Sequence, residues 1–334
     1  MDKSLEQLKK TMENNGRVLE LYAAYLNNEP YLVEKETVKT LCRDCLVSPE
    51  QAFSAILSAA FGLDGEKNAE DLVIERKYVE RSVKRLDPAV FKNDPYYKNI
   101  KIPEIKLGKW ELKYESFKPY EGFIYDDLTV LPDLTEIPNL GFFEEEFPFA
   151  AVLEDGREWM MITPNEINTM KAPIKKARGR VVTFGLGMGY YTYMASLKEE
   201  VESITVVERD PGVISLFKEY ILPRFEFKDK VNIVCADAFS YAGTVLPGGR
   251  FDVVFADMWH DVSDGLDMYI RLKRLERLTP DTEFCYWIER SLLSELRKMV
   301  FETLVSKENI TASRLLPMLT DDYLRSLAGD IRKA

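Results

Sequence analysis

The sequence is poor in histidine and cysteine and lacks a long apolar run. It has one histidine and four cysteines among 334 residues. Four cysteines are too few for a disulfide framework, and the Cys42–Cys45 spacing lacks the second ligand pair that a structural zinc site requires. No uninterrupted apolar stretch approaches the roughly 20 residues of a membrane-spanning helix. We therefore expect no metal centre and no membrane association.

Positive charge is also scarce relative to negative charge. There are 45 Lys and Arg against 56 Asp and Glu, giving a formal net charge of -11. Such a field repels phosphate backbones, so we expect no nucleic-acid partner. The first residues, Met1 to Glu6, are polar and show no signal-sequence pattern. These features predict a cytoplasmic protein with a small-molecule substrate, and they leave the oligomeric state open.

The pattern of residues changes twice along the chain and predicts three regions. Residues 1–86 read as helical, with Ser48-Pro49-Glu50 as a helix start and residues 71–86 as one amphipathic helix. Residues 87–165 read as a small β-rich segment, either an adaptor or a wall over the site downstream. In it, Asp155-Gly156 joins the two strands of a hairpin, and residues 128–147 are expected to be irregular. Residues 166–334 form the third region, with a helical C-terminus.

The third region alternates apolar strands with segments of helical length. The strands are expected at 181–184, 203–208, 231–235, 251–256 and 282–288. Their near-continuous apolar character is typical of parallel strands covered on both faces. The fold class is therefore α/β, a Rossmann-like doubly wound sheet preceded by a helical region and a small β-rich segment. Whether strands follow the fifth is left open.

The end of the first strand carries the glycine run Gly185-Leu186-Gly187-Met188-Gly189. Glycines allow a tight turn and a close approach of backbone to ligand. The dinucleotide fingerprint requires its third glycine one residue later, where this chain has Tyr190. The spacing thus favours S-adenosylmethionine (SAM) over NAD.

The next two strand ends each carry an acidic residue. Glu208 stands nineteen residues after Gly189, the separation at which a carboxylate accepts hydrogen bonds from ribose hydroxyls. Asp237 is a candidate acceptor for the adenine amino group, with Ala238 and Phe239 against the ring, and it also reads as a helix N-cap. Asp210 reads as a structural cap only.

The fourth strand end, Asp257-Met258-Trp259-His260-Asp261, is the candidate reaction site. Asp257 is expected to hold the amino group of the methionyl moiety or to act on a substrate amine. His260, the only histidine, has the chemistry of a proton carrier near neutral pH. Asp257 and His260 are therefore the predicted catalytic residues, and Trp259 either stacks on a substrate or fills the core.

Four segments at these strands together resemble the successive motifs of class I SAM-dependent methyltransferases. They are VVTFGLGMG (181–189), ITVVERD (204–210), VNIVCADAF (231–239) and FDVVFAD (251–257). The resemblance implies that Gly185, Gly187 and Gly189 flank the methionyl part of SAM. It also implies that Glu208 binds the ribose and that Asp237 and Ala238 bind the adenine.

The layout is similar to the spermidine synthase-like branch of that superfamily. Like that branch, the chain has a hydrophobic-Asp-Gly hairpin, then a short helix at 164–170, then the glycine loop. It differs in having Met188-Gly189 where the synthases carry an acidic residue, and Asp257-Met258-Trp259-His260 where they carry Asp-Ser-(Ser/Thr)-Asp. The predicted function is a SAM-dependent methyltransferase acting on a small molecule. An aminopropyl- or aminocarboxypropyl-transferase and a non-catalytic SAM-binding module remain alternatives.

Overall fold

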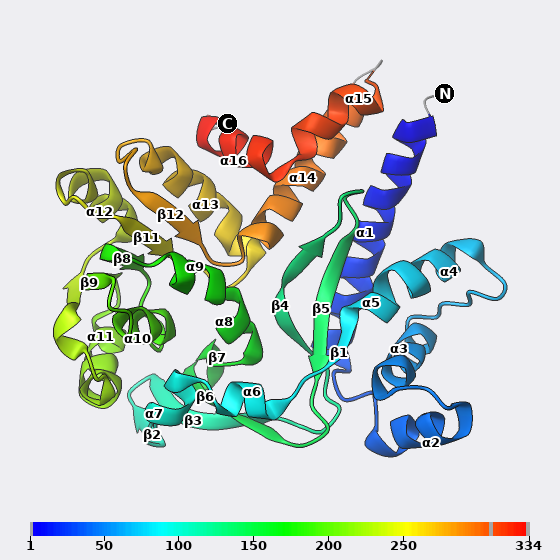
Figure 1. Ribbon diagram of the computed structural model, residues 1–334, viewed down its shortest axis with the longest axis horizontal. Helices are drawn as coiled ribbons and strands as arrows, with labels where there is room; N and C mark the ends of the chain where they lie inside the picture. Colours follow the sequence, from blue (N-terminus) through cyan, green and yellow to red (C-terminus); the bar gives the residue numbers. More distant parts are fainter. Residues whose placement is uncertain (1–2, 307–309, 332–334) are drawn as a thin grey trace. The chain divides into compact units, whose positions relative to one another are not determined.

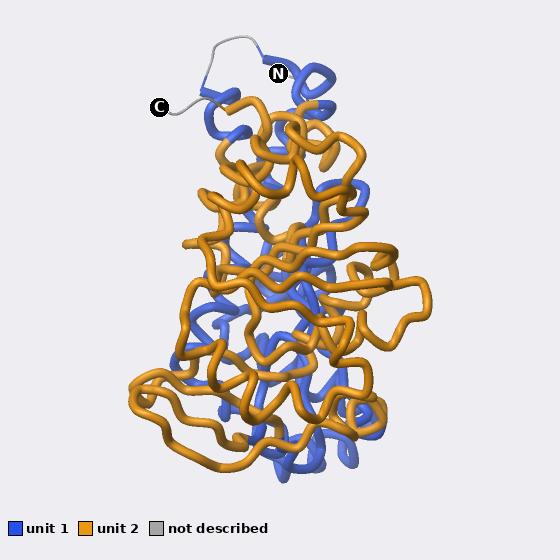
Figure 2. The backbone as a smooth tube through the Cα atoms, turned by 90° about the vertical axis from the view of Figure 1, so that its left-hand side faces the viewer, with its two compact units in different colours: residues 1–89, 116–148, 300–317 blue, residues 90–115, 149–299, 318–334 orange. Residues whose placement is uncertain are grey.

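The computed structural model describes residues 3–306 and 310–331. Within these ranges the chain forms two compact units, each assembled from separate segments (Figure 2). The first unit takes in the chain up to residue 89 together with residues 116–148 and 300–317. The second takes in residues 90–115 and 149–299 and the chain from residue 318. Segment 87–165 contributes to both units, and the division of the chain at residues 86 and 165 stays a prediction.

The second unit is built on a five-stranded parallel sheet, which confirms the predicted Rossmann-like fold (Figure 1). Its strands are β8 Gly179–Phe184, β9 Val201–Glu208, β10 Val231–Cys235, β11 Val253–Ala256 and β12 Glu283–Tyr286. They lie in the order β10-β9-β8-β11-β12, and every neighbouring pair is parallel. The strand order therefore reverses between β8 and β11, where doubly wound sheets bind their ligands.

Helices cover both faces of this sheet, because its central strands are apolar on both sides. Helices α10 Tyr190–Ser196 and α11 Pro211–Leu216 lie on one face, and α12 Ala238–Thr244 and α13 Val262–Glu276 lie on the other (Figure 1). The α11 helix begins where Asp210 Oδ1 accepts hydrogen bonds from the N–H groups of Gly212 and Val213, so the predicted capping role of Asp210 is confirmed. Across residues 3–306 and 310–331, none of the helices is both long enough and apolar enough to cross a membrane.

A four-stranded sheet precedes the parallel one along the chain. It has the order β2-β3-β6-β7, with strands β2 Ile105–Leu107, β3 Trp110–Phe117, β6 Phe147–Glu154 and β7 Arg157–Met161. The predicted hairpin is confirmed, since β6 and β7 are antiparallel partners joined at Asp155-Gly156. These two residues have φ angles of 49° and 80°, the left-handed values that a two-residue type I′ turn demands. Short helices α6 Pro88–Lys92 and α7 Pro95–Asn99 lead into β2.

The first unit is mainly helical, as the sequence predicts for its N-terminal part. Its helices are α1 Lys3–Asn28, α2 Lys35–Cys45, α3 Pro49–Ala60, α4 Ala69–Ile74 and α5 Glu80–Ser82, with a π-helical turn at Glu75–Val79. The predicted start of α3 is confirmed, because Ser48 and Gln51 cap each other reciprocally. The core of the unit is aromatic, and the rings of Phe53 and Phe142 stack at a centroid separation of 4.6 Å.

Two local predictions in this unit are wrong. The helix expected over 71–86 ends at Ser82, and Val83–Arg85 form strand β1. Residues 128–147, expected to be irregular, contain β5 Glu136–Phe142, which lies between β1 and β4 Phe123–Val130. Pro138 is accommodated because it stands where the register between β4 and β5 shifts, so no ladder hydrogen bond from it is needed. Backbone pairing on both sides of β5 outweighs its low intrinsic strand preference.

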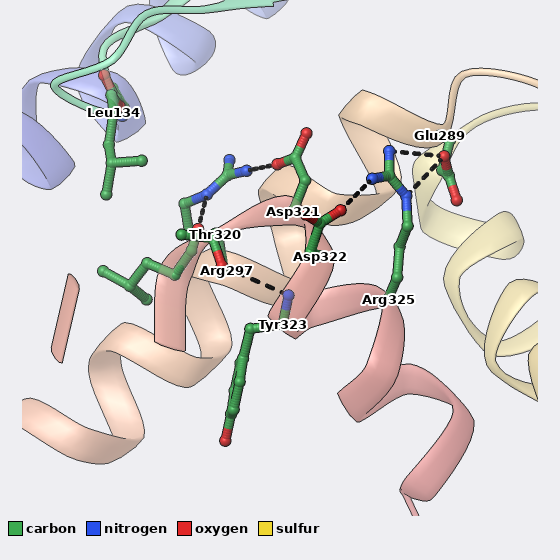
Figure 3. Close-up of polar contacts among 10 residues, drawn as sticks. Leu134, Glu289, Arg297, Thr320, Asp321, Asp322, Tyr323 and Arg325 are labelled. Atoms are coloured by element: carbon green, nitrogen blue, oxygen red, sulfur yellow. Dashed lines mark hydrogen bonds and ion pairs between the residues drawn. The ribbon is translucent and has the colours of Figure 1, made fainter. Parts of the chain in front are cut away.

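After β12 the described chain is helical, so the sheet has no strand beyond the fifth within those residues. The helices are α14 Glu289–Val305, α15 Ala312–Leu315 and α16 Asp321–Asp330. Two arginines tie α16 to α14 (Figure 3). The buried Arg297 donates to the Leu319 carbonyl at 2.9 Å and to Asp321 Oδ1 at 2.6 Å. Arg325 donates through two nitrogens to Glu289 Oε2, at 3.0 and 3.1 Å.

Two further helices, α8 Pro164–Thr169 and α9 Lys171–Lys176, connect the hairpin to β8. Pro164 occupies the first helical position of α8, where its missing N–H costs nothing. The indole Nε1 of Trp287, just after β12, donates to Thr169 Oγ1 at 2.9 Å. This bond holds the C-terminal end of α8 beside the end of the sheet.

Candidate functional site

A cavity of about 440 Å³ opens at the carboxyl ends of the parallel strands. This volume lies within the range of small-molecule binding sites. Its wall takes residues from the ends of β8, β9, β10 and β11, from strand β7, from helix α8 and from the segment after β12. The cavity therefore stands at the position that the sheet topology specifies for a ligand.

The glycine run after β8 forms one wall. Gly185 has a φ of 94°, and a Cβ atom there would stand 1.8 Å from the carbonyl oxygen of Asp257. The ends of β8 and β11 thus approach so closely that only glycine fits. Gly187 also lines the cavity, next to Met160. Gly189 does not line it, because it caps α10 with a φ of 75° and faces the ring of Phe217.

Hydrogen bonds hold the glycine loop both from helix α7 and from the cavity side. The hydroxyl of Tyr96 on α7 donates to the Met188 carbonyl at 2.6 Å, in a buried position. On the cavity side, Glu208 Oε2 accepts from the Leu186 N–H at 3.2 Å, and Oε1 accepts from the Asp210 N–H at 2.8 Å. Glu208 is only 8% exposed. Its carboxylate is therefore fixed in orientation by two backbone donors while it still lines the cavity.

The end of β10 contributes the residues predicted to contact adenine. Asp237, Ala238 and Phe239 all line the cavity. Asp237 also caps α12, since its Oδ1 accepts from the Ser240 N–H at 2.8 Å, and this bond lowers the pKa of its carboxyl. The Arg271 guanidinium lies 3.8 Å from the centre of the Phe239 ring. Phe239 thus has a cation on one side and forms part of the cavity wall.

The lining of the cavity is also rich in tryptophan and methionine. Of the four tryptophans in the chain, three line the cavity, namely Trp159, Trp259 and Trp287. The fourth, Trp110, supports Trp159 edge-on at a centroid separation of 5.0 Å. The hairpin is therefore a wall of the site, which decides between the two roles that the sequence left open for the β-rich segment.

Two carboxyl groups, those of Glu166 and Asp257, line the cavity. Asp257 follows β11, and Glu166 lies in the first turn of α8. Burial raises the pKa of the Asp257 carboxyl to about 7. The pKa of Glu166 is raised well above its ordinary value, first by burial and then by the charge of Asp257. We call Glu166 and Asp257 the acid pair.

Three buried polar atoms of cavity-lining residues have no hydrogen-bond partner in the described structure. They are Asn165 Oδ1, Glu166 Oε2 and Trp259 Nε1. Buried polar atoms in folded proteins are nearly always paired, and leaving one unpaired costs about 1–3 kcal/mol. All three residues line a single cavity, so a ligand or water bound there can supply the missing partners.

His260 lies at the exposed margin of the cavity. Its side chain is 64% exposed, and its ring Nδ1 lies 3.4 Å from Asp264 Oδ2. The backbone N–H of His260 also donates to Asp264, which caps α13 reciprocally with Asp261. The structure thus brings His260 to the same cavity as Asp257, but in a solvent-facing position. Its proposed part in proton transfer stays a prediction.

The sequence predictions missed Asn165 and Glu166. An acidic residue in the first turn of a helix is common, because it interacts favourably with the helix dipole. The segment 164–170 was recognised from its order in the chain, but no local signal marked Glu166 as buried beside Asp257.

Among the residues that the structure describes, no three His, Cys, Asp or Glu side chains gather closely enough to hold a metal ion.

Known proteins that resemble this chain are found among solved structures. No family model and no curated protein matches this chain. Among solved structures, the chain is similar to spermidine synthase from Thermotoga maritima, with 15% sequence identity and a TM-score of 0.32. The match covers 46% of this chain and 58% of that one, so this chain spans less than two thirds of the other's length. At this level of similarity, the match says nothing about the activity of this chain.

Proposed function

We propose that this protein is a SAM-dependent transferase, and that the reaction is methyl transfer to a small molecule. One observation carries the proposal. The glycine loop, the carboxylate of Glu208 and the segment Asp237–Phe239 stand at three successive strand ends and line one cavity. The spacing of these residues along the chain favours SAM over NAD, and their common cavity supports a single elongated ligand.

The residues present fit SAM. Gly187 lines the cavity against Met160, where a Cβ atom would stand 2.7 Å from Met160 Cε. Glu208 offers the remaining lone pairs of a carboxylate already oriented by two backbone donors. The ring of Phe239 offers an apolar surface for a base. Asp257 follows the end of β11, and its carbonyl oxygen lies next to Gly185. It is the residue we assign to the amino group of the methionyl moiety or to the substrate.

The bound cofactor would supply a carbon activated by a sulfonium. For such a transfer the protein mainly orients the nucleophile and excludes water. Trp159, Trp259 and Trp287 provide the apolar walls that keep water from the reacting atoms. The acid pair and His260 are the groups able to accept a proton from the nucleophile.

Calorimetric titration tests the cofactor assignment. We expect the purified protein to bind SAM and its demethylated product, S-adenosylhomocysteine (SAH), and not to bind NAD. Absence of heat with SAM, SAH and decarboxylated SAM would contradict the proposal. Native mass spectrometry of the purified protein, searching for a co-purifying ligand, provides an independent measurement.

Transfer of an aminopropyl or aminocarboxypropyl group is the second candidate. The observation that favours it is the joint contribution of the β6–β7 hairpin and α8 to the cavity, in the order found in the spermidine synthase-like branch. Incubation with decarboxylated SAM and putrescine, followed by mass spectrometry, decides the aminopropyl case. Absence of a polyamine product removes that reaction.

Substitution separates a catalytic from a non-catalytic role. We expect Asp257→Asn to abolish most of any turnover found, and His260→Ala to reduce it. If both variants retain the wild-type rate, the assignment of these residues is wrong. If SAM binds to the wild-type protein but no transfer occurs with any substrate class, the chain acts as a SAM-binding module.

A further inference from the structure

Helix α7, which lies far upstream of the parallel sheet in the chain, contacts the glycine loop outside the cavity. Asp94 caps this helix, since its Oδ1 accepts hydrogen bonds from the N–H groups of Tyr96 and Tyr97 at 2.9 and 3.3 Å. The hydroxyl of Tyr96 donates to the Met188 carbonyl at 2.6 Å. Neither Tyr96 nor Met188 is among the residues that line the cavity. The contact therefore acts on the loop and not directly on a ligand.

Tyr96 is held firmly at this position because it is almost fully buried. It is 1% exposed, and its ring packs against the rings of Tyr190 and Tyr193 on α10, each at a centroid separation of 5.5 Å. Burial raises the pKa of the Tyr96 hydroxyl well above its ordinary value. The hydroxyl therefore keeps its proton through the neutral range and remains a hydrogen-bond donor.

Two further hydrogen bonds join α7 to α10. The Tyr190 hydroxyl donates to Asp94 Oδ2 at 3.0 Å, and Asn99 Nδ2 donates to the Tyr193 hydroxyl at 2.8 Å. Helix α10 begins at Tyr190, directly after the glycine loop. These bonds fix α7 to the helix into which the loop leads. The hydroxyl of Tyr96 is the group that extends this attachment to the loop itself.

The peptide between Met188 and Gly189 needs hydrogen bonds to fix its orientation. Glycine adopts positive and negative φ angles with similar ease, so its sterics hold the preceding peptide only weakly. The N–H of Gly189 donates to the Leu186 carbonyl at 2.8 Å, and the carbonyl of the same peptide accepts from Tyr96. Gly187, which lines the cavity, lies inside the turn that this peptide closes. Loss of the Tyr96 bond thus loosens a turn that forms part of the cavity wall.

We propose that Tyr96 is a positioning residue of the cofactor site, which holds the glycine loop in the conformation that receives SAM. The inference rests on the proposed function, because it assigns a further residue to the same site. Tyr96 acts through the Met188 carbonyl and does not touch the cofactor. Its hydroxyl should therefore contribute more to cofactor affinity than a hydroxyl that makes an equivalent bond away from the loop.

Tyr96→Phe deletes only the hydroxyl and keeps the buried ring, and Tyr193→Phe is the matched control. Each substitution removes one hydrogen bond made by α7, but only the first of these bonds reaches the loop. We expect the midpoints of chemical denaturation to fall by similar amounts in the two variants. Calorimetry is expected to show SAH affinity about 10-fold weaker in Tyr96→Phe and changed less than about 2-fold in Tyr193→Phe.

Hydrogen–deuterium exchange followed by mass spectrometry tests the loop without any cofactor. We expect peptides that cover residues 185–189 to exchange faster in Tyr96→Phe than in the wild type, because the turn opens more often. The same peptides should exchange at the wild-type rate in Tyr193→Phe.

Two substitutions at Asp94 provide a second measurement. Asp94→Ala removes the cap that holds α7, whereas Asp94→Asn keeps an oxygen that accepts from the Tyr96 N–H. We expect Asp94→Ala to weaken SAH affinity and Asp94→Asn to retain most of it. Equal losses of SAH affinity in these two variants would contradict a role for α7 in positioning the loop.

The outcomes separate this inference from the proposed function. If Tyr96→Phe lowers the denaturation midpoint while SAH affinity and loop exchange keep their wild-type values, Tyr96 is only structural and the inference is overturned. Equal weakening of SAH binding in Tyr96→Phe and Tyr193→Phe overturns it as well, because the effect then belongs to the packing of α7. If the wild-type protein binds no SAH but loop exchange rises in Tyr96→Phe alone, the proposed cofactor is wrong and the role of Tyr96 in fixing the loop stands.

Discussion

The two halves of the cavity differ in whether their polar groups have hydrogen-bond partners within the protein. On the half formed by the glycine loop and β9, the polar groups already have protein partners, since both oxygens of Glu208 accept backbone hydrogen bonds. On the half formed by α8 and the end of β11, Asn165 Oδ1, Glu166 Oε2 and Trp259 Nε1 have none among the described residues. The first half is preorganised by the fold, whereas the second is costly to leave empty. Functional sites often carry such a cost in stability.

The largest effect is expected from a substitution in the half of the cavity formed by the glycine loop and β9. Gly185→Ala places a methyl group 1.8 Å from the Asp257 carbonyl oxygen, so the ends of β8 and β11 must separate. We expect a loss of about 3 kcal/mol in the free energy of unfolding, measured by chemical denaturation. Gly156→Ala is the control, because its φ of 80° is equally unfavourable while no atom lies within 4 Å of the new methyl group. A loss of only about 1 kcal/mol is expected there, and equal losses in the two variants would contradict the close approach.

The next largest effect concerns ligand affinity. In the wild type, both carboxylate oxygens of Glu208 accept hydrogen bonds from backbone N–H groups. In Glu208→Gln, the amide nitrogen replaces one of these acceptors with a donor, so the side chain turns or the loop shifts. We expect SAH affinity to fall roughly 10- to 100-fold by calorimetry. Glu202→Gln, at an exposed position of the same strand, controls for the loss of charge. Unchanged SAH binding in Glu208→Gln would remove Glu208 from the cofactor site.

The protein is expected to gain stability when the half of the cavity formed by α8 and the end of β11 is made apolar. Glu166→Met removes an unpaired buried carboxyl, and we expect an increase of about 1–3 kcal/mol in the free energy of unfolding at pH 8. The gain depends on pH. The pKa values of the acid pair are raised in the folded protein, to about 7 for Asp257. The contribution of the pair to the free energy of unfolding is therefore fully present below the unfolded pKa of about 4. It is lost as pH rises through the folded pKa values. The advantage of the variant over the wild type should therefore grow between pH 4 and pH 8.

Denaturation of Glu202→Met, a change at an exposed position of β9, provides the control for this pH dependence. That change should alter stability by less than about 0.5 kcal/mol at each pH. If Glu166→Met destabilises the protein at pH 8, Glu166 has a partner in solution and the contrast between the two halves is wrong.

The smallest effect is expected at His260. Its side chain is 64% exposed and makes one ion pair, with Asp264, at 3.4 Å. Exposed pairs of this kind contribute at most about 1 kcal/mol, so His260→Ala should change the free energy of unfolding by less than about 0.5 kcal/mol. A larger loss would show that the imidazole supports the fold, and any loss of activity in this variant could then not be assigned to proton transfer.

Much of the second unit could be predicted because its signals are local. Each apolar run from β8 to β12, like the helix cap at Asp210, depends only on residues a few positions apart in the chain. Parallel topology then follows from the alternation of strands and helices, and it brings all strand ends to one edge. For this reason Gly185, Gly187, Glu208, Asp237, Ala238, Asp257 and His260 could be placed in one cavity from the sequence.

The failed predictions depended on contacts between residues far apart in the chain. Strand β5 looked irregular because Glu136 and Pro138 disfavour strands locally. In the structure, Asn15 of α1 accepts a hydrogen bond from the Glu136 N–H at 3.1 Å, and strands β1 and β4 lie on either side. The role of Gly189 beside the methionyl part of SAM, which the family resemblance implies, stays a prediction; in the structure Gly189 has a left-handed φ and faces the ring of Phe217.

The sequence by itself determined the Rossmann-like sheet and the candidate cofactor residues, because periodicity, glycine spacing and strand-end acids act over short range. Only the tertiary structure decided which further side chains line the same cavity. Glu166 reads in the sequence as an ordinary acid at a helix start. It becomes part of an acid pair because the folded chain buries α8 beside the end of β11, where little water remains to hydrate a second charge.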